Sequence, residues 1–181
     1  MLRRSRRRSY IPRRIGGKYQ NCVTFQNNGT MVYDPASQPN ANWFFQLIPV
    51  GDTSNIRKIK GMRLSLNHHP FANYPAFNVG WAIVFVPQST PVNTLTSSTT
   101  VSNTPPVIFT NMYEPNQNVV GCGTAFSGET LKWSSRYSRN FNQGDYLVLI
   151  LQAELPEDQA GTSIAFRAGL SFTFQYFIKY N

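Results

Sequence analysis

The stretch "SIAFRAGLSFTFQYF", residues 163–177, alternates apolar and polar side chains over most of its length. One set of alternate positions is apolar: Ile164, Phe166, Ala168, Leu170, Phe172, Phe174 and Tyr176. The other set is small or polar: Ala165, Arg167, Gly169, Ser171, Thr173 and Gln175. A period of two predicts a β-strand with one face in a core and the other in water.

Two further runs have strand character. "FNVGWAIVFV", residues 77–86, places large side chains on one face, while "DYLVLILQAE", residues 145–154, is apolar on both faces through Leu151. The second run follows the turn residues "NQG" at 142–144. It is therefore predicted to be a central strand, or a strand covered by a neighbouring molecule.

The rest of the chain extends the β pattern. Further strands are expected at residues 19–26, 43–50, 56–67, 107–111 and 129–137, about eight strands in all, whereas Gly, Pro, Asn, Ser and Thr interrupt nearly every helical window. The connections at 33–42 and 87–106 are expected to be long surface loops. Eight strands are best buried as two packed antiparallel sheets, so the predicted fold is an all-β, eight-stranded jelly-roll sandwich.

The first 18 residues, "MLRRSRRRSYIPRRIGGK", have a different composition. They carry eight positive charges and no acidic residue, and the remaining chain holds nine basic and eight acidic residues. So dense a positive charge opposes folding. The prediction is a disordered arm at 1–18, which a polyanion neutralises, followed by one domain at 19–181.

The arm has the chemistry of a nucleic-acid contact, because a guanidinium matches a phosphate with two donors and displaced counterions drive sequence-tolerant binding. The candidate binding residues are Arg3, Arg4, Arg6, Arg7, Arg8, Arg13, Arg14 and Lys18. Tyr10 either stacks on an unpaired base or is a passive spacer. The run "IRKIKGMR" at 56–63 adds Arg57, Lys58, Lys60 and Arg63, either as secondary contacts or as a solvated strand face. The other interpretations of the arm are a nuclear import signal, which is also compatible with nucleic-acid contact as a second use, and a solubilising tail.

Aromatic residues are prominent at Trp43, Phe44, Phe45, Trp81, Trp133 and Tyr137. Some of them are conceivable stacking platforms for bases. Core and subunit contacts are the favoured interpretation, because Trp43-Phe44-Phe45 places bulk on both faces of one strand.

Catalytic and metal-binding patterns are not found, so neither an enzyme nor a cofactor is expected. His68 and His69 are adjacent and point to opposite faces of a strand, which argues against a shared metal. The glycine stretch "GCGTAFSG", residues 121–128, does not match a phosphate-binding loop and is interpreted as a mobile loop. Cys22 and Cys122 are expected to be free thiols. The sequence predicts neither a signal peptide nor a membrane insertion.

Four segments together resemble the capsid proteins of small circular single-stranded DNA viruses of the circovirus-like group. They are "MLRRSRRRSYIPRR", "IRKIKGMRLSL", "DYLVLILQAE" and "SIAFRAGLSFTFQYFIKY", in the family's order. The resemblance implies a jelly-roll homo-oligomer, about sixty copies in the simplest icosahedral shell, that packages single-stranded DNA inside a virion. It also implies that the arm engages the host nuclear import machinery and directs the protein to the nucleus.

Other classes share parts of this design. The coat protein of a small RNA virus or satellite virus combines the same basic arm with the same sandwich. A monomeric basic nucleic-acid-binding protein is a second alternative, although such proteins usually keep strong positive charge on the globular part. A carbohydrate-binding or enzymatic jelly roll is a third alternative, and the missing catalytic constellation argues against it.

Overall fold

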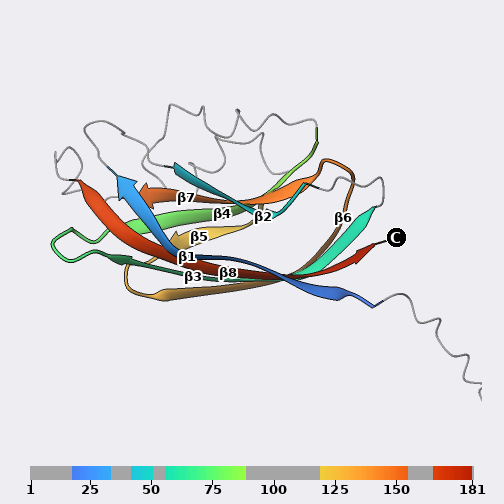
Figure 1. Ribbon diagram of the computed structural model, residues 1–181, viewed down its shortest axis with the longest axis horizontal. Helices are drawn as coiled ribbons and strands as arrows, with labels where there is room; N and C mark the ends of the chain where they lie inside the picture. The colour runs from blue at the N-terminus through green and yellow to red at the C-terminus, as the bar shows by residue number, and fades with distance from the viewer. Residues whose placement is uncertain (1–17, 34–41, 51–55, 89–118, 155–164, 181) are drawn as a thin grey trace, which may run out of the picture.

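The structure is a computed structural model that describes residues 18–33, 42–50, 56–88, 119–154 and 165–180. These residues form eight strands and no helix (Figure 1). The strands are β1 (Gln20–Tyr33), β2 (Asn42–Ile48), β3 (Arg57–Pro70), β4 (Asn78–Val86), β5 (Val119–Ala125), β6 (Thr130–Phe141), β7 (Tyr146–Glu154) and β8 (Phe166–Tyr180).

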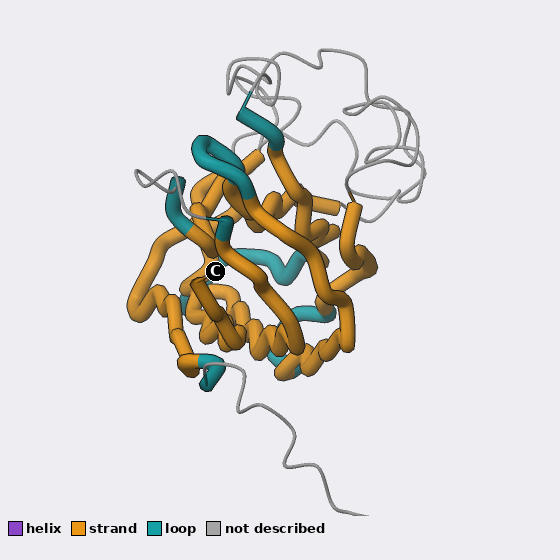
Figure 2. Tube along the Cα trace, turned by 90° about the vertical axis from the view of Figure 1, so that its right-hand side faces the viewer, coloured by secondary structure: helices purple, strands orange, loops and turns teal. Residues whose placement is uncertain are grey.

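The strands form two antiparallel four-stranded sheets that lie face to face (Figures 1 and 2). The β8 sheet has the strand order β1-β8-β3-β6, and the β7 sheet has the order β2-β7-β4-β5. Only β4 and β5 are consecutive in the chain and adjacent in one sheet, and every other connection between successive strands passes from one sheet to the other. This strand order is that of a double Greek key, which confirms the predicted jelly roll.

Strand β8 follows the alternation that its sequence predicts. Its inward residues are buried: Phe166, Ala168, Leu170, Phe172, Phe174, Tyr176 and Ile178. The strand pairs with β1 on one side and β3 on the other, for example through Thr173, which lies opposite both Phe25 and Ser65. A shift of one residue in either register would turn the apolar row out to solvent, so the buried face fixes the pairing.

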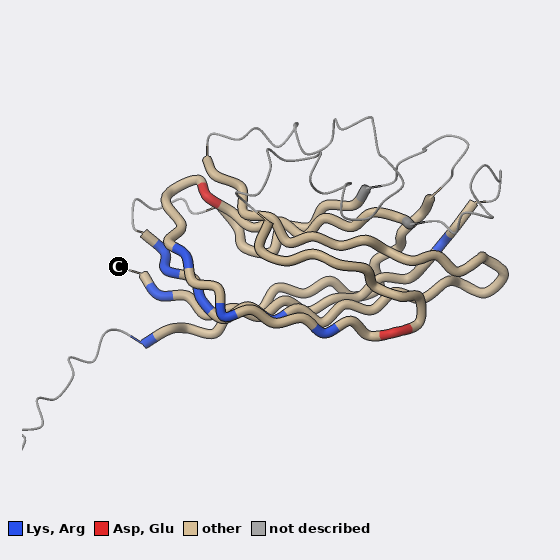
Figure 3. Tube along the Cα trace, turned by 180° about the vertical axis from the view of Figure 1, so that it is seen from behind, with Lys and Arg blue, Asp and Glu red and all other residues tan. Residues whose placement is uncertain are grey.

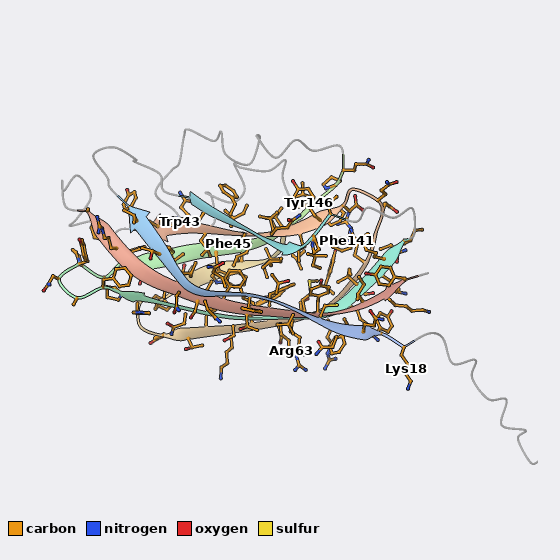
Figure 4. All side chains as sticks on the ribbon, viewed as in Figure 1. Lys18, Trp43, Phe45, Arg63, Phe141 and Tyr146 are labelled. Atoms are coloured by element: carbon orange, nitrogen blue, oxygen red, sulfur yellow. The ribbon has the colours of Figure 1, made fainter. Side chains whose placement is uncertain are left out.

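Aromatic side chains join the two sheets across the core. The ring of Phe45 lies 5.2 Å from that of Phe172, and the ring of Phe85 lies 5.0 Å from that of Phe141, both edge to face. Such pairs add about 0.5–1.5 kcal/mol each beyond the burial of their area. Figure 4 shows Phe45 and Phe141 within the sandwich.

Strand β7 lies between β2 and β4, which confirms that it is central. The apolar residues on its second face, with those of β4, form a separate buried cluster: Ala82, Val84, Val86, Tyr146, Val148 and Ile150, with Phe44 packed against them. Strand β7 is thus buried on both faces, as its doubly apolar sequence predicts.

The prediction of a mobile loop at 121–128 is wrong. Residues 119–125 form β5, which pairs with β4, and the turn begins only at Phe126. The glycines serve close packing, because a Cβ atom on Gly121 would lie 2.5 Å from the Trp133 ring and one on Gly123 would lie 3.2 Å from the Trp81 ring. Gly123 lies opposite Trp81 in the β4–β5 pairing, and Gly121 faces Trp133 of the other sheet, so the need for glycine at these positions depends on contacts that are distant in the sequence.

The other strand predictions are confirmed with different ends. The strand expected at 19–26 continues to Tyr33, and the one expected at 129–137 continues to Phe141. The strand expected at 107–111 and the loop cores at 34–41 and 89–106 lie outside the described residues. The same holds for residues 1–17 of the arm, so the disorder of the arm and the boundary at 18 stay predictions.

Replacing Gly121 with Ala tests the packing of β5. The new methyl group would overlap the Trp133 ring, so the variant should lose about 1–3 kcal/mol of unfolding free energy in urea titrations. Cys122→Ala is the matched control, because Cys122 is exposed on the same strand and should change stability by less than about 0.5 kcal/mol. Equal effects of the two substitutions would contradict the close approach of Gly121 to Trp133.

Candidate nucleic-acid interface

Every lysine and arginine after Lys18 lies in the β8 sheet. The nine residues are Arg57, Lys58, Lys60, Arg63, Lys132, Arg136, Arg139, Arg167 and Lys179. The four strands of this sheet contain no Asp or Glu, and all eight acidic residues of the chain lie outside them. Figure 3 shows the basic positions along this layer. Glu129 and Asp145 lie between strands, directly before β6 and β7. The domain has nearly equal numbers of basic and acidic residues, but the basic residues are all in the β8 sheet and the acidic residues are all outside its strands.

Seven of the nine cations are on the outward side of the β8 sheet, which we call the basic face. They are Lys58, Lys60, Arg63, Lys132, Arg136, Arg167 and Lys179. The register explains their common orientation, because Lys58 lies directly opposite Lys179, and directly opposite residues of an antiparallel pair share a face. None of the seven forms an ion pair with another residue in the ranges that the structure describes. Their charge is thus available to an external anion.

Arg57 and Arg139 are not part of the basic face. The Arg57 side chain is 5% exposed, and its guanidinium donates hydrogen bonds of 2.7 Å to the carbonyl oxygens of Pro49 and Asp145. The Arg139 guanidinium lies 3.5 Å from the centre of the Phe85 ring. Arg57 therefore ties the two sheets together at one end of the sandwich. Arg57 and Ile59 are two residues apart on one strand and therefore lie on the same face, and this spacing could have predicted the burial of Arg57 from the sequence.

The other predicted secondary contacts, Lys58, Lys60 and Arg63, are all exposed on the basic face. Figure 4 shows Arg63 pointing away from the sandwich and Lys18 just before β1, the edge strand of the same sheet. The Lys60 ammonium lies 3.7 Å from the centre of the Tyr19 ring. The root of the arm is thus held beside the basic face. Tyr10 and the arm arginines from Arg3 to Arg14 lie outside the described residues.

Four cations of the basic face were not singled out from the sequence: Lys132, Arg136, Arg167 and Lys179. They are isolated in the sequence and gather only because β6 and β8 flank β3. Alternation within β6 predicts that Lys132 and Arg136 share a face. It does not predict that Lys132 lies opposite Ser65 of β3, which in turn lies opposite Thr173 of β8.

The prominent aromatic residues contribute to the core. Trp43, Phe45, Trp133 and Tyr137 pack against the main cluster, and Trp81 is 2% exposed and lies edge to face with Trp133 at 5.8 Å. Phe44 packs against the second cluster. These positions confirm the interpretation of the aromatic group as core, since none of them is on the basic face.

The histidines point to opposite faces, as expected. His68 is fully buried and its Nε2 lies 2.9 Å from the carbonyl oxygen of Phe77, while His69 is exposed. Burial lowers the pKa of His68 below 6.5, against a raising effect of the Phe77 hydrogen bond, and His69 lowers it further. Its Nδ1 has no hydrogen-bond partner, so a proton added there would be buried without an acceptor.

The described residues offer no metal site and no paired thiols. No group of three or more His, Cys, Asp or Glu side chains in these ranges is arranged to hold a metal ion. Cys22 and Cys122 are both free thiols. The described part of the chain contains no helix that is long and apolar enough to cross a membrane.

Topology and charge together define the chain as a jelly-roll sandwich with one cationic sheet face. No protein-family model matches it, and no curated protein sequence does either. Several solved structures are similar in part, at low identity, among them these three. The Triatoma virus structure is 16% identical with a TM-score of 0.45, over 98% of this chain and 75% of that one.

The second structure is an aminopeptidase from the marine sediment archaeon Thaumarchaeota archaeon, 9% identical with a TM-score of 0.38, over 89% of this chain and 33% of that one. The third is Desmodium yellow mottle tymovirus, 10% identical with a TM-score of 0.23, over 98% and 91%. The jelly roll itself follows from the strand order of the two sheets.

The buried His68 predicts an acid-sensitive fold. Because its folded pKa is below its unfolded value, the unfolded chain binds more protons, and stability falls as the pH drops below about 6.5, by up to about 1.4 kcal/mol per pH unit. Urea titrations between neutral and mildly acidic pH should show this loss in the wild type and in His69→Gln, and a weaker pH dependence in His68→Gln. An unchanged pH dependence in His68→Gln would contradict the assignment.

Proposed function

We propose that the protein is a viral coat protein whose jelly roll builds a small icosahedral shell and whose arm packages single-stranded DNA. The observation that carries the proposal is the location of positive charge on a jelly-roll frame. Eight cations lie in the first 18 residues, and seven more lie on the one sheet face beside the arm's root. A β-sandwich has no structural need for so many unpaired cations on one side.

The arm acts by charge neutralisation. Each arginine stays protonated, binds a phosphate through two donors and releases condensed counterions. Arg3, Arg4, Arg6, Arg7, Arg8, Arg13, Arg14 and Lys18 carry this contact. Tyr10 adds a stacking surface for an unpaired base. Binding of this kind tolerates any sequence, as packaging of a whole genome requires.

The shell forms from copies of the sandwich, with the basic face and the arm turned toward the genome. The protein is then a homo-oligomer of about sixty copies in the simplest closed shell and is located in the virion. The arm serves a second purpose in this scheme, as an import signal that the host nuclear import machinery recognises.

Two other functions are consistent with some of the same observations. A coat protein of a small RNA or satellite virus has the same physical design, since phosphate contacts do not distinguish the two nucleic acids. A monomeric nucleic-acid-binding protein is favoured by the basic face, because the domain is not uniformly neutral as its composition suggests. Particle formation separates the coat proteins from the monomer.

Expression of the full chain tests packaging and assembly together. The wild type should give particles of uniform size in electron micrographs, with absorbance at 260 nm raised above that of protein alone. A glutamine-arm variant, in which the eight arm cations Arg3, Arg4, Arg6, Arg7, Arg8, Arg13, Arg14 and Lys18 are all replaced by Gln, should lose most of the copurifying nucleic acid. A wild type that sediments as a monomer free of nucleic acid would remove the proposal.

Nuclease digestion distinguishes the packaged material. Nucleic acid extracted from the particles of infected or replicating cells should be degraded by a single-strand DNA nuclease and resist ribonuclease. Degradation by ribonuclease alone would establish the RNA-virus alternative instead.

Fusion of residues 1–18 to a fluorescent protein tests import. The wild-type arm should concentrate the fusion in the nucleus, and the glutamine-arm sequence should leave it distributed through the cell. Equal distribution of the two fusions would remove the import role and leave packaging untouched.

A further inference from the structure

We propose that the basic face is itself a binding site for single-stranded nucleic acid, with Phe25 as a base-stacking platform and a hollow around Arg63 and Lys132 as the phosphate site. This inference rests on the proposed packaging function and assigns part of it to the folded domain. It is carried by a hollow, an exposed aromatic ring and a charge pattern that occur together on one sheet.

The hollow lies at the middle of the basic face, where β3, β6 and β8 run side by side. It has a volume of about 500 Å³. Its outward side chains are two cations, three hydroxyls and one amide: Arg63, Lys132, Ser65, Ser134, Thr173 and Gln175. Hydroxyl and amide groups donate to phosphate oxygens alongside the charged groups, as in many nucleic-acid interfaces.

The strand register arranges these residues in two rows across the sheet. One row is Phe25, Thr173, Ser65 and Lys132, and the neighbouring row is Val23, Gln175, Arg63 and Ser134. Adjacent strands lie about 4.8 Å apart, so Phe25 and Lys132 are separated by about 14 Å across the face. A flexible polynucleotide can therefore cross from the aromatic edge to the hollow.

Nothing in the packing of the domain requires an aromatic side chain at Phe25, which is not part of the core. Its side chain is 63% exposed at the centre of β1, beside Val23 at 51%, although both could be polar without loss of core packing. Stacking of a base on an exposed aromatic ring is available only to unpaired bases. The ring thus favours a single strand over a duplex.

Charge determines the class of occupant. The seven unpaired cations and the absence of acidic residues from all four strands match a polyanion. A second copy of the same face is a poor occupant, because two such surfaces repel each other. An acidic protein would neutralise the cations and would make no use of a base-stacking platform.

The experiment uses the full-length glutamine-arm variant, so that binding by the arm does not mask binding by the face. Unassembled protein is isolated by gel filtration and titrated into fluorescently labelled oligothymidylate, with anisotropy as the readout at several salt concentrations. The variant should bind measurably, with log K falling as log salt rises. Adding Arg63→Gln and Lys132→Gln should reduce that slope by about 1.4, which corresponds to two lost single-strand phosphate contacts.

Two controls make the result specific. Arg167→Gln with Lys179→Gln removes the same charge from the two ends of β8 and should reduce affinity several-fold less than the Arg63 and Lys132 pair. Phe25→Ala should weaken oligothymidylate binding about tenfold and leave binding of inorganic polyphosphate unchanged, since polyphosphate has no bases. Val32→Ala, also exposed on β1, should change neither. Unchanged urea midpoints establish that all variants are folded.

Each contrary result has a distinct meaning. If the glutamine-arm variant fails to bind while the wild type binds, the inference is overturned and packaging by the arm stands. If neither binds, both proposals fail. Equal losses from the two cation pairs would overturn the hollow as a site, and a Phe25→Ala variant with wild-type affinity would overturn the stacking platform. Altered sedimentation without altered binding would identify the face as a contact between copies.

Discussion

The pairing of β8 with both β1 and β3 is the constraint on which the rest of the structure depends. One face of β8 supplies seven buried side chains to the core, and the other supplies Arg167, Thr173, Gln175 and Lys179 to the basic face. Because the side-chain period of a strand is two, the register that buries the apolar row also fixes where the cations lie. The same strand register therefore forms the core and places the cations on the outer face. A shift by one residue would expose the apolar row and turn the cations inward.

Concentration of charge on one sheet has an energetic consequence. The seven cations of the basic face repel one another and lower the stability of the isolated domain, and the first 18 residues carry eight more positive charges. A bound polyanion removes that repulsion and stabilises the folded state by mass action. In a shell of about sixty copies the arms would supply ~480 charges and the faces ~420 more, so the domain would neutralise nearly as much phosphate as the arm.

The sequence predicted the architecture because alternation is a local signal, clearest in residues 163–177 and weakest where small residues are needed. Strand β5 was missed because Gly121 and Gly123 have low strand propensity, and their value appears only beneath Trp133 and Trp81. The basic face was predicted in part through Lys58, Lys60 and Arg63, which are close in sequence. Lys132 and Arg136 join them through the pairing of β3 with β6, which composition and periodicity do not encode.

The chemistry of the basic face also limits how copies can contact one another. Burying Arg63 or Lys132 against a neighbouring protein would cost several kcal/mol of desolvation per charge unless a carboxylate met each one. Nucleic acid imposes no such cost, because its phosphates are matched charges and the interface stays hydrated. If copies associate, their contacts are therefore expected away from the basic face, which stays open to a polyanion.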